Sequence, residues 1–174
     1  MTQPPDQSDR SRDGTVHERA DGYELRFERH LLHPVEKVWA ALTDPARRAQ
    51  WFAPGEIELR LGGRVSLAFT DGEGVIDGRV TAIEPPRLLE FTWTDQGNDV
   101  GFVRWELIAE DGGTRLVLTH NLPGSDREFG LPALAGWHSL LDKLAALLDG
   151  QPFARDCWQE LHDHYARTGV MGDR

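Results

Sequence analysis

Apolar and polar residues alternate along much of the chain, a pattern that predicts β-strands. In the run YELRFERH, Tyr23, Leu25 and Phe27 alternate with charged residues, so one face of this strand is expected to be buried. Consecutive strands with short connections favour an antiparallel meander, because parallel strands need longer crossovers. Six more strand-like runs follow, separated by Gly, Pro and Asp turn residues, at 56–61, 64–70, 74–84, 87–95, 100–110 and 114–121.

Apolar residues at helical spacing occur in three other regions. Pro34 and Pro45 stand at helix-starting positions and predict two short helices before residue 53. The segment from about 131 to 148 predicts one long helix with a wide apolar face, and 154–166 predicts a last amphipathic helix. This order of elements predicts an α+β fold, a curved antiparallel sheet wrapped around the long C-terminal helix. The apolar face of that helix comprises Leu134, Trp137, Leu140, Leu141, Leu144, Leu147 and Leu148.

The chain has 174 residues and is expected to form one domain, residues 21–168, between two tails. The segment 1–20 is rich in Pro, Asp, Ser and Arg and is expected to be a flexible tail, because it has little to bury. Residues 169–174 are expected to form a short C-terminal tail. No segment has the apolar length of a signal peptide or a membrane span, which predicts a cytoplasmic protein.

Charge and cysteine content narrow the function classes. The formal net charge is −10, from 19 basic and 29 acidic side chains. Such a surface repels phosphate backbones and anionic lipids, so we expect no nucleic-acid partner and no membrane insertion. Cys157 is the only cysteine, which excludes an internal disulfide and fits a reducing compartment. We predict that its thiol is structural, because no basic partner occurs at helical spacing.

Five motifs together resemble a known family. They are HPVEKVWAALTDPARRAQWFAP (33–54), the turn Gly62-Gly63-Arg64, IEPPRLLEFTW (83–93), GGTRLVLTHNLP (112–123) and GWHSLLDKLAALLDG (136–150). In order and spacing they are similar to the bacterial branch of the heat-shock protein 90 ATPase activator homologue family, within the START-like (SRPBCC) superfamily. The resemblance covers residues 23 to about 167. The eukaryotic co-chaperones of that family carry a separate N-terminal domain, and only about twenty polar residues precede the fold here, which speaks against ATPase activation.

The resemblance implies a helix-grip fold with a cavity between the sheet and the C-terminal helix, often suited to hydrophobic ligands. Our leading hypothesis is therefore a carrier or sensor of a small apolar ligand. No catalytic residue, metal or cofactor is predicted, and the family name suggests a link to stress response. The expected ligand-binding residues lie at inward positions of the strands and the long helix: Phe91, Trp93, Trp105, Leu118, His120, Trp137 and Leu141.

Histidines are the side chains with the widest choice of roles. His120 shares strand parity with Leu116 and Leu118 and is expected on the concave face. There it would hold a ligand oxygen, act as a base, or serve as a core histidine bonded to the backbone or to a Trp; we favour the core role. His162 and His164 point about 200° apart on a helix, so we do not expect them to share a metal ion.

Two pairs of charged residues share strand faces: Asp77 with Arg79, and Arg104 with Glu106. The opposite faces are apolar, so we predict that these charges form a solvated lattice on the convex face. If they faced the cavity instead, they would form an acid–base set.

Two other functions stay open. A protein-interaction or co-chaperone-like module would use the acidic surface, the short helix at 45–52 and the final helix, and a homodimer is also open. A cyclase- or hydrolase-type enzyme would use His120 as general base, although we do not expect catalysis. A dry, closed core favours interaction, whereas an open cavity on the order of several hundred cubic ångströms favours ligand binding or catalysis.

Overall fold

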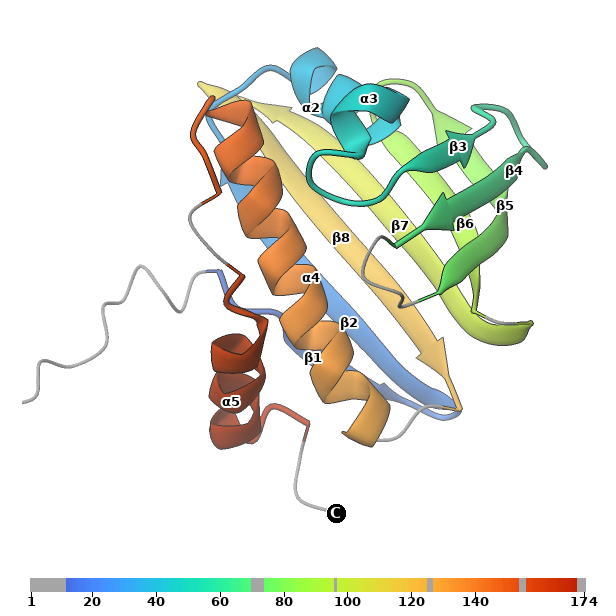
Figure 1. The fold of residues 1–174 in the computed structure, drawn as a ribbon, viewed down its shortest axis with the longest axis vertical. Helices are drawn as coiled ribbons and strands as arrows, with labels where there is room; N and C mark the ends of the chain where they lie inside the picture. The colour runs from blue at the N-terminus through green and yellow to red at the C-terminus, as the bar shows by residue number, and fades with distance from the viewer. Residues whose placement is uncertain (1–11, 70–73, 96, 125–126, 154–155, 172–174) are drawn as a thin grey trace, which may run out of the picture.

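The computed structural model describes residues 12–69, 74–95, 97–124, 127–153 and 156–171. Within these residues, eight strands form one antiparallel sheet, and the long helix α4 (Arg127–Leu148) lies across one face of it (Figure 1). The other helices are α2 (Val35–Thr43), α3 (Pro45–Arg48) and α5 (Trp158–Thr168). The strands are β1 (Thr15–Arg19), β2 (Gly22–Leu31), β3 (Gly55–Ile57), β4 (Arg64–Ala68), β5 (Val75–Glu84), β6 (Leu88–Asp95), β7 (Asn98–Glu110) and β8 (Gly113–Pro123).

The strand order is β1-β2-β8-β7-β6-β5-β4-β3, and every neighbouring pair is antiparallel. From β3 to β8 each strand pairs with the next in sequence, as the short turns predicted. Only β2 departs from this rule, because α2 and α3 separate it from β3 and it pairs with β8 instead. The predicted fold class, an α+β helix-grip sheet around a long helix, is confirmed.

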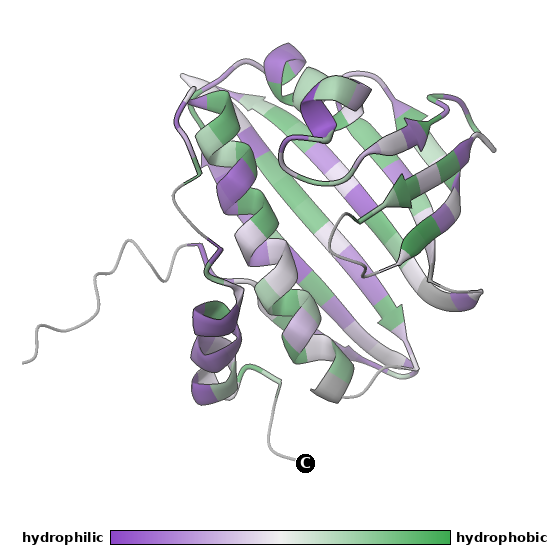
Figure 2. Cartoon of the chain, viewed as in Figure 1, coloured by the Kyte–Doolittle hydropathy of each residue, from purple (hydrophilic) through white to green (hydrophobic). Residues whose placement is uncertain are grey.

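The core lies between α4 and the sheet. Hydrophobic and hydrophilic residues alternate along the strands (Figure 2). Leu140 and Leu147, at the margins of the predicted apolar face, are only half-buried, so the contact stripe is narrower than the full arc. The buried residues of the helix face are Leu134, Trp137, Leu141, Leu144 and Leu148.

The predicted strand at 56–61 is wrong beyond Ile57. The backbone of Glu58 donates to the Arg64 carbonyl at 2.9 Å, and the Glu58 carboxylate accepts from the Arg64 N–H at 2.7 Å. These bonds close a loop over 58–64, so Leu61 lies 70% exposed instead of on a strand face. The Gly62 and Gly63 backbones then pair with Val80 of β5.

The predicted flexible tail at 1–20 is also wrong in its C-terminal part. Thr15–Arg19 forms β1, which pairs with β2 over its whole length. Gly14 is buried so closely that a Cβ there would clash with the Phe27 ring. The first eleven residues lie outside the described ones. At the other end, Met171 of the predicted tail 169–174 packs in the core against Gly130, and 172–174 lie outside the description.

A buried arginine holds α2 and α3 in place at one end of the sheet. Arg48 donates through Nη1 to the Thr43 carbonyl at 3.2 Å and through Nη2 to the Gly55 carbonyl at 2.5 Å. The indole of Trp51 donates to the Ala41 carbonyl at 2.8 Å. The guanidinium thus satisfies the Thr43 carbonyl, which the end of α2 leaves without a helical partner, and links it to the start of β3. Phe52 follows directly and is placed over the sheet.

The charged strand residues lie on the solvated convex face, as predicted. Arg104 pairs with Glu90 at 2.9 Å and with Glu106 at 3.6 Å, and Arg64 pairs with Asp77 at 3.6 Å. Such exposed pairs contribute about 0–1 kcal/mol each to stability. No helix in the described part of the chain is long and apolar enough to cross a membrane.

Candidate functional site

An aromatic cluster fills the middle of the space between α4 and the sheet. Trp137 of α4 stands at its centre, with ring centroids 5.3 Å from Trp93, 5.6 Å from Trp105 and 5.6 Å from Phe52. Separations of this size are typical of edge-to-face and offset contacts between rings. The aromatic cluster comprises Trp51, Phe52, Phe69, Phe91, Trp93, Trp105, His120 and Trp137.

His120 joins this cluster through a hydrogen bond. The Trp137 Nε1–H donates to His120 Nδ1 at 2.9 Å, in a buried setting. Because Nδ1 accepts, a neutral His120 carries its proton on Nε2. The Trp93 ring lies 5.3 Å from the imidazole. His120 therefore has the predicted core role, bonded to a Trp, and its Nδ1 atom is already engaged.

The structure brings all seven predicted ligand-binding residues into this one region. Trp93 is 9% exposed, and His120 and Trp137 are each 4% exposed, so these three keep some accessible surface. The other four, Phe91, Trp105, Leu118 and Leu141, are completely buried below them. That these residues contact a ligand stays a prediction.

Trp105 carries a buried polar group with no partner. Among the described residues, no acceptor lies within hydrogen-bonding reach of its Nε1–H. The rings of Trp51 and Trp137 stand nearly perpendicular to it, at 5.9 and 5.6 Å. A weak N–H···π contact is the interaction such an arrangement permits. An oxygen acceptor placed beside this indole would form a stronger hydrogen bond.

A second group of polar side chains lies on the other side of α4, where α5 and the N-terminal segment cover the helix. His138 Nδ1 and the Tyr165 hydroxyl are 2.8 Å apart, and the Gly14 N–H donates to the same hydroxyl at 2.8 Å. His164 Nε2 lies 2.8 Å from an Asp13 carboxylate oxygen. We call this group the outer polar cluster; it comprises Asp13, Arg29, His138, Asp142, His164 and Tyr165.

Burial governs the electrostatics of the outer polar cluster. It raises the pKa of Tyr165 far above its usual value of 10.0, and it lowers the pKa of Arg29 below its usual value. Arg29 Nη2 lies 3.8 Å from an Asp142 oxygen, and His138 Nε2 lies 3.6 Å from the other. Sequence reasoning missed this cluster. Its one local signal was a pair of polar residues, His138 and Asp142, one turn apart beside the apolar face of α4.

The structure also places the histidines considered as metal ligands and the single cysteine. In the described part of the chain, no three His, Cys, Asp or Glu side chains converge on a point that could hold a metal ion. His162 stacks on Trp158 at 5.2 Å, whereas His164 turns toward Asp13. Cys157 is half-buried where α5 begins.

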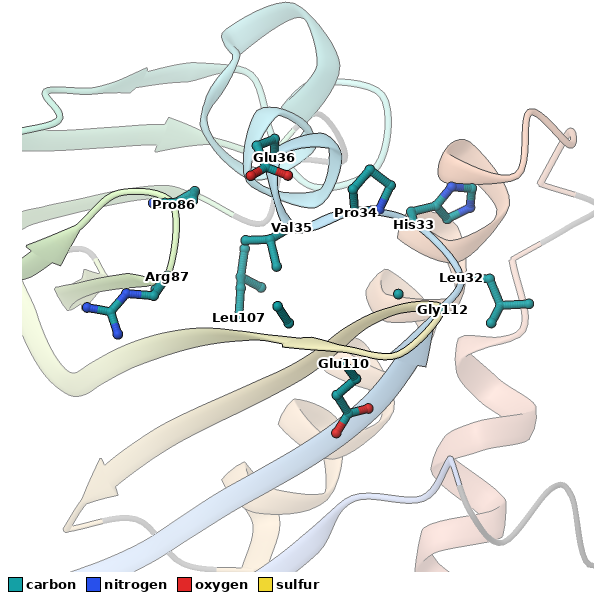
Figure 3. A pocket seen from close by; sticks show the side chains of 12 residues that line it. Leu32, His33, Pro34, Val35, Glu36, Pro86, Arg87, Leu107, Glu110 and Gly112 are labelled. Atoms are coloured by element: carbon teal, nitrogen blue, oxygen red, sulfur yellow. The ribbon is translucent and has the colours of Figure 1, made fainter.

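A groove of about 550 Å³ opens at one end of the sheet, apart from the aromatic cluster (Figure 3). It lies between the start of α2, the turn from β5 to β6, and the hairpin of β7 and β8. Pro34, Val35 and Leu107 form an apolar wall, and Leu32 at the rim is 84% exposed. None of the seven predicted ligand-binding residues lines this groove.

Comparison with solved structures finds the same fold repeatedly. MLL2253 from Mesorhizobium loti is 31% identical, with a TM-score of 0.65 over 75% of this chain and 99% of that one. CalU16 from Micromonospora echinospora is 28% identical, with a TM-score of 0.69 over 90% of this chain and 95% of that one. DynU16, a putative protein in the dynemicin biosynthetic locus, is 32% identical, with a TM-score of 0.66 over 74% of this chain and 48% of that one.

No curated protein matches the chain. A family model described as Activator of Hsp90 ATPase homolog 1-like protein matches residues 32–149, from the end of β2 to just past the end of α4. This match covers more than half of the chain and includes all eight residues of the aromatic cluster. The chain belongs to the Activator of Hsp90 ATPase homolog 1-like family and has the START-like helix-grip fold.

Proposed function

We propose that this protein is a cytoplasmic carrier or sensor that binds a small, planar, apolar molecule between α4 and the sheet. The ligand would lie against Trp93, His120 and Trp137, the three ring-bearing residues of the predicted site that keep accessible surface. Phe91, Trp105, Leu118 and Leu141 would form the floor beneath it. The observation that carries the proposal is the aromatic cluster itself, with its buried and unpartnered Trp105 N–H.

The composition of the cluster favours a particular ligand class. Aromatic faces bind flat, apolar surfaces by stacking and edge contacts. The nearby polar atoms include an indole N–H without an acceptor. A planar ring system that bears a carbonyl or phenolic oxygen would supply both the flat surface and the missing acceptor. A plain hydrocarbon would leave the Trp105 donor unsatisfied, as it is in the free protein, and would forgo the contribution of about 0.5–1.5 kcal/mol that a hydrogen bond makes.

Binding requires the rings to move. Their centroids are already 5.3–5.6 Å apart around Trp137, which is contact distance. A ligand would therefore have to separate α4 and Trp137 from Trp93 and replace the ring contacts that are lost. Association is then expected to be slower than for a preformed pocket, because a conformational change lowers the association rate.

The comparisons support a small-molecule role from another direction. One similar structure, DynU16, belongs to a protein in the dynemicin biosynthetic locus, which associates a similar fold with small-molecule biosynthesis. It is 32% identical over 74% of this chain and 48% of its own length. The family match and the shared helix-grip fold support the choice of the space between helix and sheet for such a ligand.

A titration tests the proposal. Trp fluorescence and calorimetry would be recorded while oleic acid, cholesterol or 1,8-dihydroxyanthraquinone is added to the full chain. We expect the anthraquinone to bind at about micromolar strength, equivalent to about −8 kcal/mol. His120→Leu and Trp93→Leu should each weaken binding at least about tenfold, as the loss of about 1.4 kcal/mol implies.

Trp158→Leu is the matched control, because Trp158 lies on the surface of α5, outside the aromatic cluster. Thermal melting of each variant would establish that the fold is intact. If no member of the panel binds, or if Trp158→Leu weakens binding as much as Trp93→Leu, the carrier proposal fails.

A further inference from the structure

The groove at the end of the sheet borders an unpaired stretch of strand. β6 begins at Leu88, which pairs with Glu106, whereas β7 continues to Glu110. The last bond across this edge runs from the Leu107 N–H to the Arg87 carbonyl, at 2.8 Å. Beyond it, β7 pairs only with β8, and Ala109 lies past the end of β6.

The backbone of Ala109 faces the open side. In an antiparallel pair, hydrogen-bonding groups point to alternate sides of a strand. Since the Leu107 N–H points toward Arg87, the N–H and C=O of Ala109, two residues on, point the same way. In the described part of the chain, no backbone group pairs with Ala109 on that side. Free strand edges of this kind accept an added strand.

The groove gives this edge an apolar recess. Leu107 and Val35 point into it in Figure 3, while Arg87 and Glu110 point away from it. At about 550 Å³ it can hold one or two side chains of an added strand. Leu32, 84% exposed at the rim, adds apolar surface that has no burial partner in the described fold.

The charges around the groove select the partner. Arg87 is paired with Glu84 at 2.7 Å, and Glu110 is paired with Arg115 at 2.8 Å. Glu36 is exposed and makes no ion pair with a described residue, so its carboxylate is the free charge at the rim. The protein also has a formal net charge of −10. A partner segment with basic side chains would therefore be attracted.

We propose that this groove is a docking site for an extended peptide segment of a partner protein, in which an apolar and a basic residue stand two positions apart and so share one face of the added strand. The segment would add as a short strand beside Ala109 and place an apolar side chain against Val35 and Leu107. A basic side chain would pair with Glu36. This interaction is independent of the aromatic cluster and of any small ligand bound there.

The test uses the full chain and capped six-residue peptides, followed by amide chemical shifts. A peptide in which Val and Lys stand two positions apart, separated by Thr, should shift the amides of Ala109, Gly112 and Gly113 with a dissociation constant of about 0.1–1 mM, as for weak strand addition. Peptides with Ser in place of Val, or Glu in place of Lys, should bind at least about tenfold more weakly. Methylating the peptide nitrogens that face Ala109 should also abolish binding.

Three variants sharpen the result. Ala109→Pro removes the donor at the edge and should eliminate the shifts, and Glu36→Lys should reverse the preference between the Lys and Glu peptides. Leu32→Lys, at an exposed position where folding is not at risk, should weaken binding of the Lys–Val peptide. The proposal is overturned if the shifts lie elsewhere, if the methylated peptide binds equally well, or if the groove amides shift with protein concentration alone, which would identify a second copy as the occupant.

Discussion

The two sides of α4 are built by opposite means. Its inner side carries Trp137, which lies in the aromatic cluster, and its outer side carries the adjacent His138, which lies in the outer polar cluster. Both side chains are buried. The inner side is buried by apolar periodicity within one helix. The outer side is buried because two segments distant in sequence, around Gly14 and Tyr165, close over it with hydrogen bonds.

The difference teaches which contacts are specified locally. An apolar stripe buries itself against any apolar surface of suitable shape, because the hydrophobic effect has no direction. A polar group is buried without large cost only when its particular partners are present. On the inner side, the free energy of unfolding should therefore fall when buried side-chain volume is removed. On the outer side, it should fall when a single hydrogen-bonding atom is removed.

The largest expected loss of stability comes from a substitution on the inner side of α4. Leu144→Ala should lower the free energy of unfolding by about 2–5 kcal/mol, because it leaves a cavity in the core under α4. Urea denaturation measures this loss. Leu32→Ala, at a position 84% exposed, is the matched control and should change stability by less than about 0.5 kcal/mol. Equal effects of the two variants would contradict the placement of α4.

The second-largest loss of stability is expected when the N-terminal segment that covers the outer side of α4 is deleted. A chain that begins at Ala20 should be less stable than one that begins at Arg12 by about 2 kcal/mol or more. The shorter chain loses the β1 ladder and the Gly14 bond to Tyr165, and each hydrogen bond contributes about 0.5–1.5 kcal/mol. Equal denaturation midpoints for the two chains would show that this segment adds nothing to the fold.

On the outer side of α4, the removal of a single atom should be enough to lower the stability of the fold. Tyr165→Phe removes the hydroxyl that lies 2.8 Å from both His138 Nδ1 and the Gly14 nitrogen. Leaving these buried groups without a partner should cost about 1–3 kcal/mol. Tyr23→Phe, at the only other tyrosine of the chain, is the control. The outer cluster would be energetically neutral if both variants unfolded at the same urea concentration.

High pH should weaken the outer side selectively. Burial raises the pKa of Tyr165 above its usual 10.0, so the folded state favours the protonated phenol. Its contribution to stability is complete below pH 10.0 and is lost as the pH rises above that value, by at most about 1.4 kcal/mol per pH unit. Urea denaturation between pH 9 and pH 11 measures the slope. Tyr165→Phe should reduce it, and an unchanged slope would contradict the assignment.

Much of the inner side could be predicted from the sequence. The period-two runs of β6, β7 and β8 and the 3.6-residue period of α4 place Trp93, Trp105 and Trp137 on facing surfaces. Strand parity and helix phase place His120 and Trp137 on facing surfaces, but the hydrogen bond between them is known only from the structure. The packing of the rings could not be predicted, because periodicity indicates a side chain's direction and not the volume left between side chains.

The outer side could not be predicted, because its signals are nonlocal. Residues 15–19 read as part of a polar tail and become a strand only because β2 offers a free edge. The burial of His138 depends on Tyr165, 27 residues away. The loop at 58–64 was misread for a related reason, since the alternation of Ile57, Leu59 and Leu61 is overridden by the bonds between Glu58 and Arg64.

The central claim is that a ligand binds against the aromatic cluster, and the six indole N–H signals of the protein test it most directly. Amide-correlation spectra would be recorded with and without 1,8-dihydroxyanthraquinone. We expect the signals of Trp93, Trp105 and Trp137 to shift, with Trp105 moving toward the position of a hydrogen-bonded indole, while Trp158 stays in place. Unchanged signals from those three residues, or a shift confined to Trp158, would contradict the claim.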